Sequence, residues 1–430
     1  MRHAPIPADL FIANRQRLAA MLDPRSLAVV VANDQLATNA DGSVSYVPNS
    51  DLFYLTGVEQ EETILVLFPQ AADERNREIL FVREPIEYLK IWEGHKLSKD
   101  EAKSLTGITT IKWLSEFPVA FRSLMIEAQN VYLNANEHGR AHVEHDNADT
   151  RFAHKTQAAF PLHTYRRLAP LLHKLRVRKS QQEIDLLQKA VDITAAGFDR
   201  LLKFVKPGVW ENEVEAELAH EYTRNRARFA YNAIIASGGN ANVLHYNSND
   251  QQCKDGDVLL MDVAANYANY AADLTRTIPI NGRFTARQRK VYDAVLRVMR
   301  QSIAGATVGK MHRQWQNESR AMMNQELLQL GLITQEQVDK HTEDEPACKK
   351  YFMHGLGHVL GIDVHDVGPM WEPFAPGWVL TVEPGIYIPD EGFGVRLENN
   401  IVVTESGPID LTGNIPVEAE EIEQIMNKGR

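Results

Sequence analysis

The chain has 430 residues, 44% of them hydrophobic and 24% charged, so a folded protein with more than one domain is expected. Its formal net charge of −11 argues against a nucleic-acid partner, which would need a basic surface. The only cysteines, Cys253 and Cys348, exclude a disulfide framework and fit a reducing, cytoplasmic compartment. No apolar run is long enough to span a membrane, and residues 1–7 lack the apolar segment of a secretion signal, so no membrane partner is expected.

The first third of the chain has the pattern of an α/β domain. Apolar segments of strand length and β-branched composition occur at Leu27–Val31, Thr63–Phe68, Ile79–Val82 and Val131–Leu133, and a helix is expected near Ser115–Ala128. A basic segment, Arg166–Lys179, follows them. We therefore expect residues 1–175 to form one domain and residues 176–430 another.

The second domain is predicted to alternate between helices and strands. Ser180 and Glu183 form a capping box at the start of a long amphipathic helix, which Pro207-Gly208 ends. Further helices are expected over Val214–Tyr222, Thr285–Met299 and His312–Leu330, and strands over Asp257–Val263, Ala272–Ile278, Trp378–Val382 and Gly394–Thr404. The order helices, strands, helices, strands suggests two structurally related halves.

Five residues that can bind metal occur in or beside the strand-like segments of this domain: Asp262, Asp273, His358, Glu383 and Glu398. Asp262 and Glu383 each end an apolar run, where a charge is costly to bury unless it is paired or bound to a metal. Four carboxylates and one imidazole suit two divalent ions with bridging carboxylates. Without cations, like charges at this spacing could not all stay ionised.

Two histidines stand four residues apart, in the segment Phe352–His358. Glycines between His354 and His358 allow the backbone to approach other groups closely, and His365 follows. Each residue alone has a plainer interpretation. An Asp at a strand end is usually a turn residue, and histidines beside a Gly-rich turn can be structural.

Five segments taken together resemble the aminopeptidase P and prolidase branch of the pita-bread metallopeptidases: Asn240–Tyr246, Asp262–Thr277, His354–Gly368, Thr381–Tyr387 and Gly394–Asn400. Pro48–Gly57 resembles the N-terminal domain of that family, so the resemblance covers nearly the full chain. It implies an α/β (α+β) fold, in which a creatinase-like α/β domain precedes a pita-bread catalytic domain with pseudo-twofold halves.

The resemblance also implies a role for each matching residue. Asp262 would bind one metal ion, Asp273 and Glu398 would bridge both ions, and His358 and Glu383 would complete the second site. His245, His354 and His365 would surround the substrate and the tetrahedral intermediate, with Glu383 also acting as general base. Tyr387 and Arg396 would support the metal carboxylates.

The chain departs from the family pattern between the first two ligands. The family usually carries glycine where this sequence has Ala264 and Asn269. Asn tolerates left-handed backbone better than most residues, so we expect Asn269 to form the turn.

The implied reaction is hydrolysis of the N-terminal Xaa-Pro peptide bond by a hydroxide that bridges two divalent ions. Mn²⁺ is the first expectation, and Co²⁺ or Zn²⁺ would also suit the ligands. Two alternatives stay open: a prolidase that cleaves only Xaa-Pro dipeptides, and a catalytically inactive pita-bread binding module. The short connection Pro369–Val382 has no arginine to bind a dipeptide's carboxylate, which favours the aminopeptidase.

Trp92 matches a family position that can reach the active site of a neighbouring subunit. This predicts a homodimer or homotetramer. The alternative is that Trp92 is an ordinary core or surface residue of the small domain.

Overall fold

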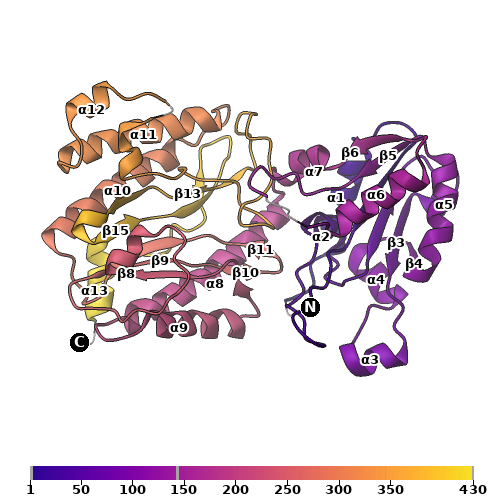
Figure 1. The fold of residues 1–430 in the computed structure, drawn as a ribbon, viewed down its shortest axis with the longest axis horizontal. Helices are drawn as coiled ribbons and strands as arrows, with labels where there is room; N and C mark the ends of the chain where they lie inside the picture. The colour runs from indigo at the N-terminus through magenta and orange to yellow at the C-terminus, as the bar shows by residue number, and fades with distance from the viewer. Residues whose placement is uncertain (1–2, 142–144, 344, 429–430) are drawn as a thin grey trace. The chain divides into compact units, whose positions relative to one another are not determined.

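A computed structural model describes residues 3–141, 145–343 and 345–428. The chain divides into two compact units, His3–Arg176 and Val177–Arg430 (Figure 1). Among the described residues, no helix combines the length and the apolar composition needed to cross a membrane.

The first unit is built on a six-stranded mixed sheet with the strand order β4-β3-β2-β1-β5-β6. Its elements are α1 (Ala8–Ala19), β1 (Ser26–Val31), α2 (Ser50–Thr56), β2 (Ile64–Leu67), β3 (Glu78–Val82), α3 (Glu87–Glu93), α4 (Lys99–Thr106), β4 (Thr110–Trp113), α5 (Phe117–Glu127), β5 (Asn130–Leu133), α6 (Ala148–Ala159), β6 (Thr164–Arg167) and α7 (Ala169–Arg176). The predicted strands correspond to β1, β2, β3 and β5, and the predicted helix to α5. The two outer strands were missed, because β4 and β6 lack a continuous apolar run.

The core of this unit lies between the sheet and its helices. β1 is buried along its whole length, as expected for a strand with both faces covered. Leu27, Val29 and Val31 share one cluster with Phe121 of α5, and Phe152 of α6 packs against that cluster. The period-two pattern of β1 therefore places alternate side chains on the α5–α6 side.

A buried carboxylate near the start of α6 gives this unit a pH-dependent stability. Burial raises the pKa of Asp149 from its ordinary 3.8 to about 7, and the Asp51 carboxylate adds to the shift, while a hydrogen bond from Asn49 Nδ2 (3.3 Å) opposes it. Because the folded pKa exceeds the unfolded one, stability is lost as the pH rises from about 4 towards 7. We expect Asp149→Asn to raise the free energy of unfolding by roughly 2–4 kcal/mol at pH 8.

Chemical denaturation at pH 4 and pH 8 measures this effect. Near pH 4 the gain from Asp149→Asn should largely vanish, because Asp149 is protonated there in the folded state. An equal gain at both pH values, or none at pH 8, would contradict the assignment.

The second unit places its strands between two helix pairs, α8–α9 and α10–α11, as Figure 1 shows. Its elements are α8 (Gln181–Phe204), α9 (Glu211–Arg224), β7 (Arg228–Phe229), β8 (Ile234–Ser237), β9 (Val258–Asp262), β10 (Ala265–Tyr267), β11 (Tyr270–Ala271), β12 (Thr275–Pro279), α10 (Ala286–Gly305), α11 (His312–Gln329), α12 (Gln335–Asp339), β13 (Val379–Val382), β14 (Gly385–Ile388), β15 (Phe393–Arg396), β16 (Asn399–Val402), β17 (Ile409–Asp410) and α13 (Ala419–Asn427). The predicted capping box at Ser180 is present and begins α8, and another at Thr285 begins α10.

One predicted strand is wrong in a way that matters for the site. Gly394–Thr404 is not continuous, because it forms β15, which pairs with β14, and β16, which pairs with β13 and β17. The chain leaves one sheet and joins another at Leu397-Glu398, and the Glu398 N–H donates to the carbonyl of Thr275 (3.0 Å). The break directs the buried Glu398 side chain into the interior.

The hairpin between β10 and β11 explains the departure from the family's glycines. Ala268 and Asn269 form its turn with positive φ values of 53° and 62°, a pair typical of a tight two-residue hairpin turn. The left-handed conformation predicted for Asn269 is therefore present. Ala264 is not among the described residues with positive φ, so its methyl group is accommodated without backbone strain.

Candidate active site

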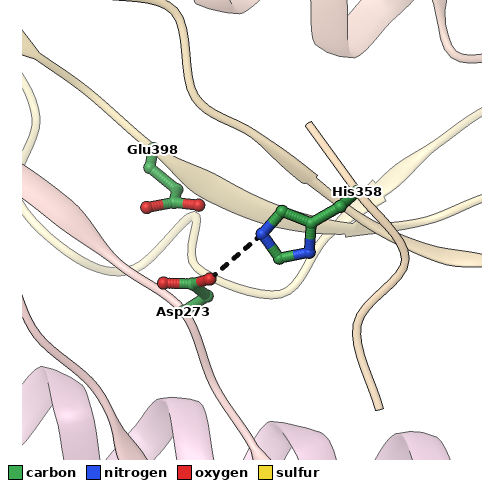
Figure 2. Close-up of side chains that lie close together, drawn as sticks. All are labelled: Asp273, His358 and Glu398. Atoms are coloured by element: carbon green, nitrogen blue, oxygen red, sulfur yellow. Dashed lines mark ion pairs between the residues drawn. The ribbon is translucent and has the colours of Figure 1, made fainter. Parts of the chain in front are cut away.

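Three of the predicted ligands form a compact group. One ligand atom each from Asp273, His358 and Glu398 lies within 4.8 Å of the others. Figure 2 shows the two carboxylates facing one another, with the His358 ring beside Asp273. His358 Nε2 lies 3.4 Å from Asp273 Oδ2, and both carboxylates are buried. Three segments far apart in sequence thus converge here.

The other two predicted ligands lie at the edges of this group. Glu383 follows β13, with Oε1 3.7 Å from His358 Nε2 and Oε2 3.9 Å from His354 Nδ1. Asp262 ends β9, where it stands opposite Thr275 in the register of β9 and β12. Thr275 lies only two residues after Asp273, so the pairing of β9 with β12 brings Asp262 and Asp273 close together.

Tyr231 contacts two of the predicted ligands, a position that the sequence did not reveal. Its hydroxyl lies 2.5 Å from Asp262 Oδ1 and 2.6 Å from Asp273 Oδ1. Burial raises its pKa well above the usual range, and the two carboxylates raise it further, so the phenol stays protonated. No motif marks Tyr231 in the sequence. The structure brings it to the aspartates because Ile234, three residues on, pairs with Asp262 in the β8–β9 register.

The buried carboxylates of the group lie so close together that a bound cation would stabilise their charged forms. Burial, followed by the charges of Asp273 and Glu383, raises the pKa of Glu398 well above its ordinary value. Burial also raises the pKa of Glu383 to about 7. A single Tyr231 proton can be donated to only one of its two carboxylates. Divalent cations would relieve this crowding, and a set of carboxylates with one imidazole suits them, so the residues fit a divalent-metal site.

Arg396 supports two of the predicted metal carboxylates, as expected. Arg396 Nη2 donates to Asp262 Oδ2 (2.7 Å) and its Nε donates to Thr275 Oγ1 (3.1 Å). Thr275 Oγ1 in turn donates to Glu398 Oε2 (2.8 Å). Arg396 therefore holds one carboxylate directly and reaches the other through Thr275.

Tyr387 contacts a histidine rather than a metal carboxylate. Its hydroxyl accepts from Arg396 Nη1 (2.8 Å) and lies 2.7 Å from His354 Nε2. Burial, followed by the Arg396 charge, lowers the pKa of His354 to about 4, so its imidazole is neutral. His354 Nδ1 lies 2.8 Å from the Gly355 carbonyl, which assigns the proton to Nδ1 and leaves Nε2 to accept from Tyr387.

The remaining predicted residues are more exposed. The His365 ring packs against that of His358, with centroids 4.2 Å apart. His245 is exposed and, within the described residues, has no hydrogen bond to the group, although its charge contributes to the low pKa of His354. Trp92 lies in α3 of the first unit with 72% of its surface exposed, next to Tyr88.

Comparison with known proteins identifies the family. Residues 185–405 match the model of metallopeptidase family M24, and residues 11–132 match that of the aminopeptidase P N-terminal domain. The chain is 36% identical to the Xaa-Pro aminopeptidase of Escherichia coli over 98% of both chains. It is 32% identical to human Xaa-Pro aminopeptidase 3, over 93% of this chain and 80% of the relative.

Solved structures agree with this result. Zinc-substituted Escherichia coli aminopeptidase P in complex with product matches with a TM-score of 0.88 at 33% identity, covering 99% of this chain and 100% of that one. The same enzyme with the inhibitor Pro-Leu matches with a TM-score of 0.86 at 35% identity, covering 98% and 99%.

The chain therefore belongs to metallopeptidase family M24, and it carries the N-terminal domain of the aminopeptidase P type. It is a hydrolase, a metallo-aminopeptidase with a mixed α/β N-terminal domain and a pita-bread domain, so the predicted family and fold are confirmed. The acidic group and the family together support binding of divalent metal.

Proposed function

We propose that this chain is an Xaa-Pro aminopeptidase that removes the residue preceding a proline at the N-terminus of a peptide. The observation that carries the proposal is the convergence of Asp273, His358 and Glu398, with Glu383 beside them, in a chain that matches Xaa-Pro aminopeptidases over nearly its full length. The same comparisons do not favour a dipeptide-specific prolidase or an inactive binding module. Residues 1–175 serve as the N-terminal domain and residues 176–430 as the catalytic domain.

The metal centre of this proposal contains two divalent ions, with Mn²⁺ as the first candidate and Co²⁺ or Zn²⁺ as alternatives. Its ligands are Asp262, Asp273, His358, Glu383 and Glu398. When bound, the ions supply an activated water and polarise the scissile carbonyl.

The side chains around the centre would handle the protons. Glu383, which lies beside His358 and His354, would accept a proton from the attacking water and return it to the proline nitrogen as the bond breaks. The Nδ1–H of the neutral His354 lies on the side facing Glu383. His245 and His365 contact substrate in this scheme. Because an Xaa-Pro amide has no N–H, recognition depends on the proline ring and the free N-terminus.

Substrate length is the direct test of the aminopeptidase proposal. We expect a higher kcat/KM for Xaa-Pro-Yaa-Zaa peptides than for the Xaa-Pro dipeptide with the same first residue. Between Pro369 and Val382 no arginine can bind a dipeptide's carboxylate, and Phe374 and Trp378 are buried in the core, which leaves Trp371 as the exposed large side chain. Strong preference for the dipeptide, with longer peptides inert, would instead establish a prolidase.

Assembly is a second testable part of the proposal. We expect a homodimer or homotetramer in which Trp92 contributes to substrate binding, because Ile86, Tyr88, Ile91 and Trp92 expose apolar surface around α3. Light scattering should give two or four times the chain mass, and Trp92→Ala should lower kcat/KM by about tenfold. A fully active monomer, or unchanged kinetics in Trp92→Ala, would contradict it.

A cytoplasmic location completes the proposal. It is supported by the free, buried Cys253 and Cys348, which fit a reducing compartment.

A further inference from the structure

A buried ion pair lies at the end of the loop that carries His365. Lys179 Nζ is 2.9 Å from Asp366 Oδ2, and the two side chains are only 1% and 2% exposed. The pair joins the first residues of the second unit to a segment 187 positions later. Neither Lys179 nor Asp366 has a part in the chemistry described above.

The loop between Val359 and Asp366 is fastened at points next to the metal-binding group. The Asp366 N–H donates to the Val359 carbonyl (2.9 Å), which closes the loop directly after His358. The Ala271 N–H donates to the Gly361 carbonyl (2.9 Å), two residues before Asp273. His365 thus lies in a loop that is hydrogen-bonded next to His358 at one point and close to Asp273 at another.

The ion pair is packed closely against Gly361 and lies beside Gly377. A Cβ on Gly361 would lie 2.0 Å from Asp366 Oδ2 and 2.9 Å from Lys179 Cε. The Lys179 N–H donates to the carbonyl of Gly377 (2.8 Å), whose φ of +86° is one that favours glycine. Packing against Gly361 and the backbone hydrogen bond of Lys179 therefore both constrain the ion pair.

Stability alone does not account for this pair. Two charges lose their hydration on burial, and their attraction repays only part of that loss, so two apolar side chains of similar size would stabilise the fold as well. The ion pair instead fixes which way the side chains of the loop point. It draws Asp366 into the interior, while its neighbour His365 stays exposed against the His358 ring, 4.2 Å away.

We propose that Lys179 and Asp366 are positioning residues that hold the His365 loop, and through it His365, in the geometry needed for turnover. The inference rests on the proposed Xaa-Pro aminopeptidase function and deepens it. Asp366 directly follows His365, and its N–H closes the loop that begins after His358, so we expect the pair to act through His365.

The test compares Lys179→Met, Asp366→Leu and the double variant. Each single change removes one partner of the buried ion pair and should lower the melting temperature, whereas the double variant should recover most of it. Metal content should stay at the wild-type level in the double variant. Its kcat on an Xaa-Pro-Yaa-Zaa peptide should nevertheless fall by about tenfold or more, because His365 is no longer held.

A double-mutant cycle with His365→Ala shows whether the ion pair affects kcat through His365. His365→Ala should reduce kcat strongly in the wild-type background and only slightly in the Lys179→Met/Asp366→Leu background, because the same contribution cannot be lost twice. Amide hydrogen exchange of residues 359–366 should also be faster in the double variant, which reports on the loop without any assay of turnover.

The control is Arg297→Met/Glu326→Leu, which removes a partly exposed ion pair between α10 and α11 (Nη2 to Oε2, 2.6 Å) and should leave kcat unchanged. The inference is overturned if the Lys179/Asp366 double variant keeps wild-type kcat, or if His365→Ala costs the same in both backgrounds. If the wild-type enzyme is inert on every Xaa-Pro peptide, the proposed function fails. Hydrogen exchange of the loop then decides the positioning claim separately.

Discussion

Alanine in place of Asp273 or Glu398 is expected to abolish metal binding and reduce kcat/KM by at least about a thousandfold. The family resemblance implies that each of these carboxylates would contact both ions, and both are buried beside other acids. Losing either one removes a shared ligand. Metal analysis of the purified variants should find neither ion at a stoichiometric level.

Chelation of the wild-type enzyme should give the same loss of activity, and Mn²⁺ or Co²⁺ should restore it. Asp273→Ala and Glu398→Ala should not be restored at the metal concentration that restores the wild type. Glu405→Ala, which removes an exposed carboxylate of the same unit, is the control and should retain both ions and full activity. An Asp273→Ala protein with two bound ions and normal turnover would refute the bridging role.

Much of the fold could be predicted because its signals are local. The capping boxes at Ser180 and Thr285 and the apolar stripes that follow them define helices whose ends are set by nearby residues. The inner strands of the first unit have apolar runs that reflect burial on both faces. Its outer strands, such as β6 with the sequence Thr164–Arg167, have no such run, and their pairing depends on neighbours distant in sequence.

In the candidate site, too, some residues could be predicted from local sequence and others depended on contacts between distant segments. Residue type and spacing indicated the carboxylates and His358, because unpaired charges after apolar runs are unusual. Tyr231 and Thr275 were missed, although one contacts two of the carboxylates and the other links Arg396 to Glu398. Those contacts follow from the registers of β8, β9 and β12, and the spacing of residues along one segment does not encode the register between segments.

His358, His354 and His245 should separate into two classes. We expect His358→Ala to lose metal, and His354→Ala and His245→Ala to keep it while losing turnover by roughly a hundredfold or more. His358 Nε2 faces both Asp273 and Glu383, whereas His354 is engaged with Tyr387 and Gly355.

The classes can be distinguished by measuring metal content and kcat on the same preparations. His341→Ala, which changes an exposed histidine of the same unit, controls for nonspecific effects and should match the wild type in both measurements. A conservative change gives a further check on His354. Because its neutral ring accepts from the Tyr387 hydroxyl, Tyr387→Phe should reduce kcat in the same direction and leave the metal bound. Equal loss of metal in His358→Ala, His354→Ala and His245→Ala would mean that the division between metal-binding and substrate-facing histidines is wrong.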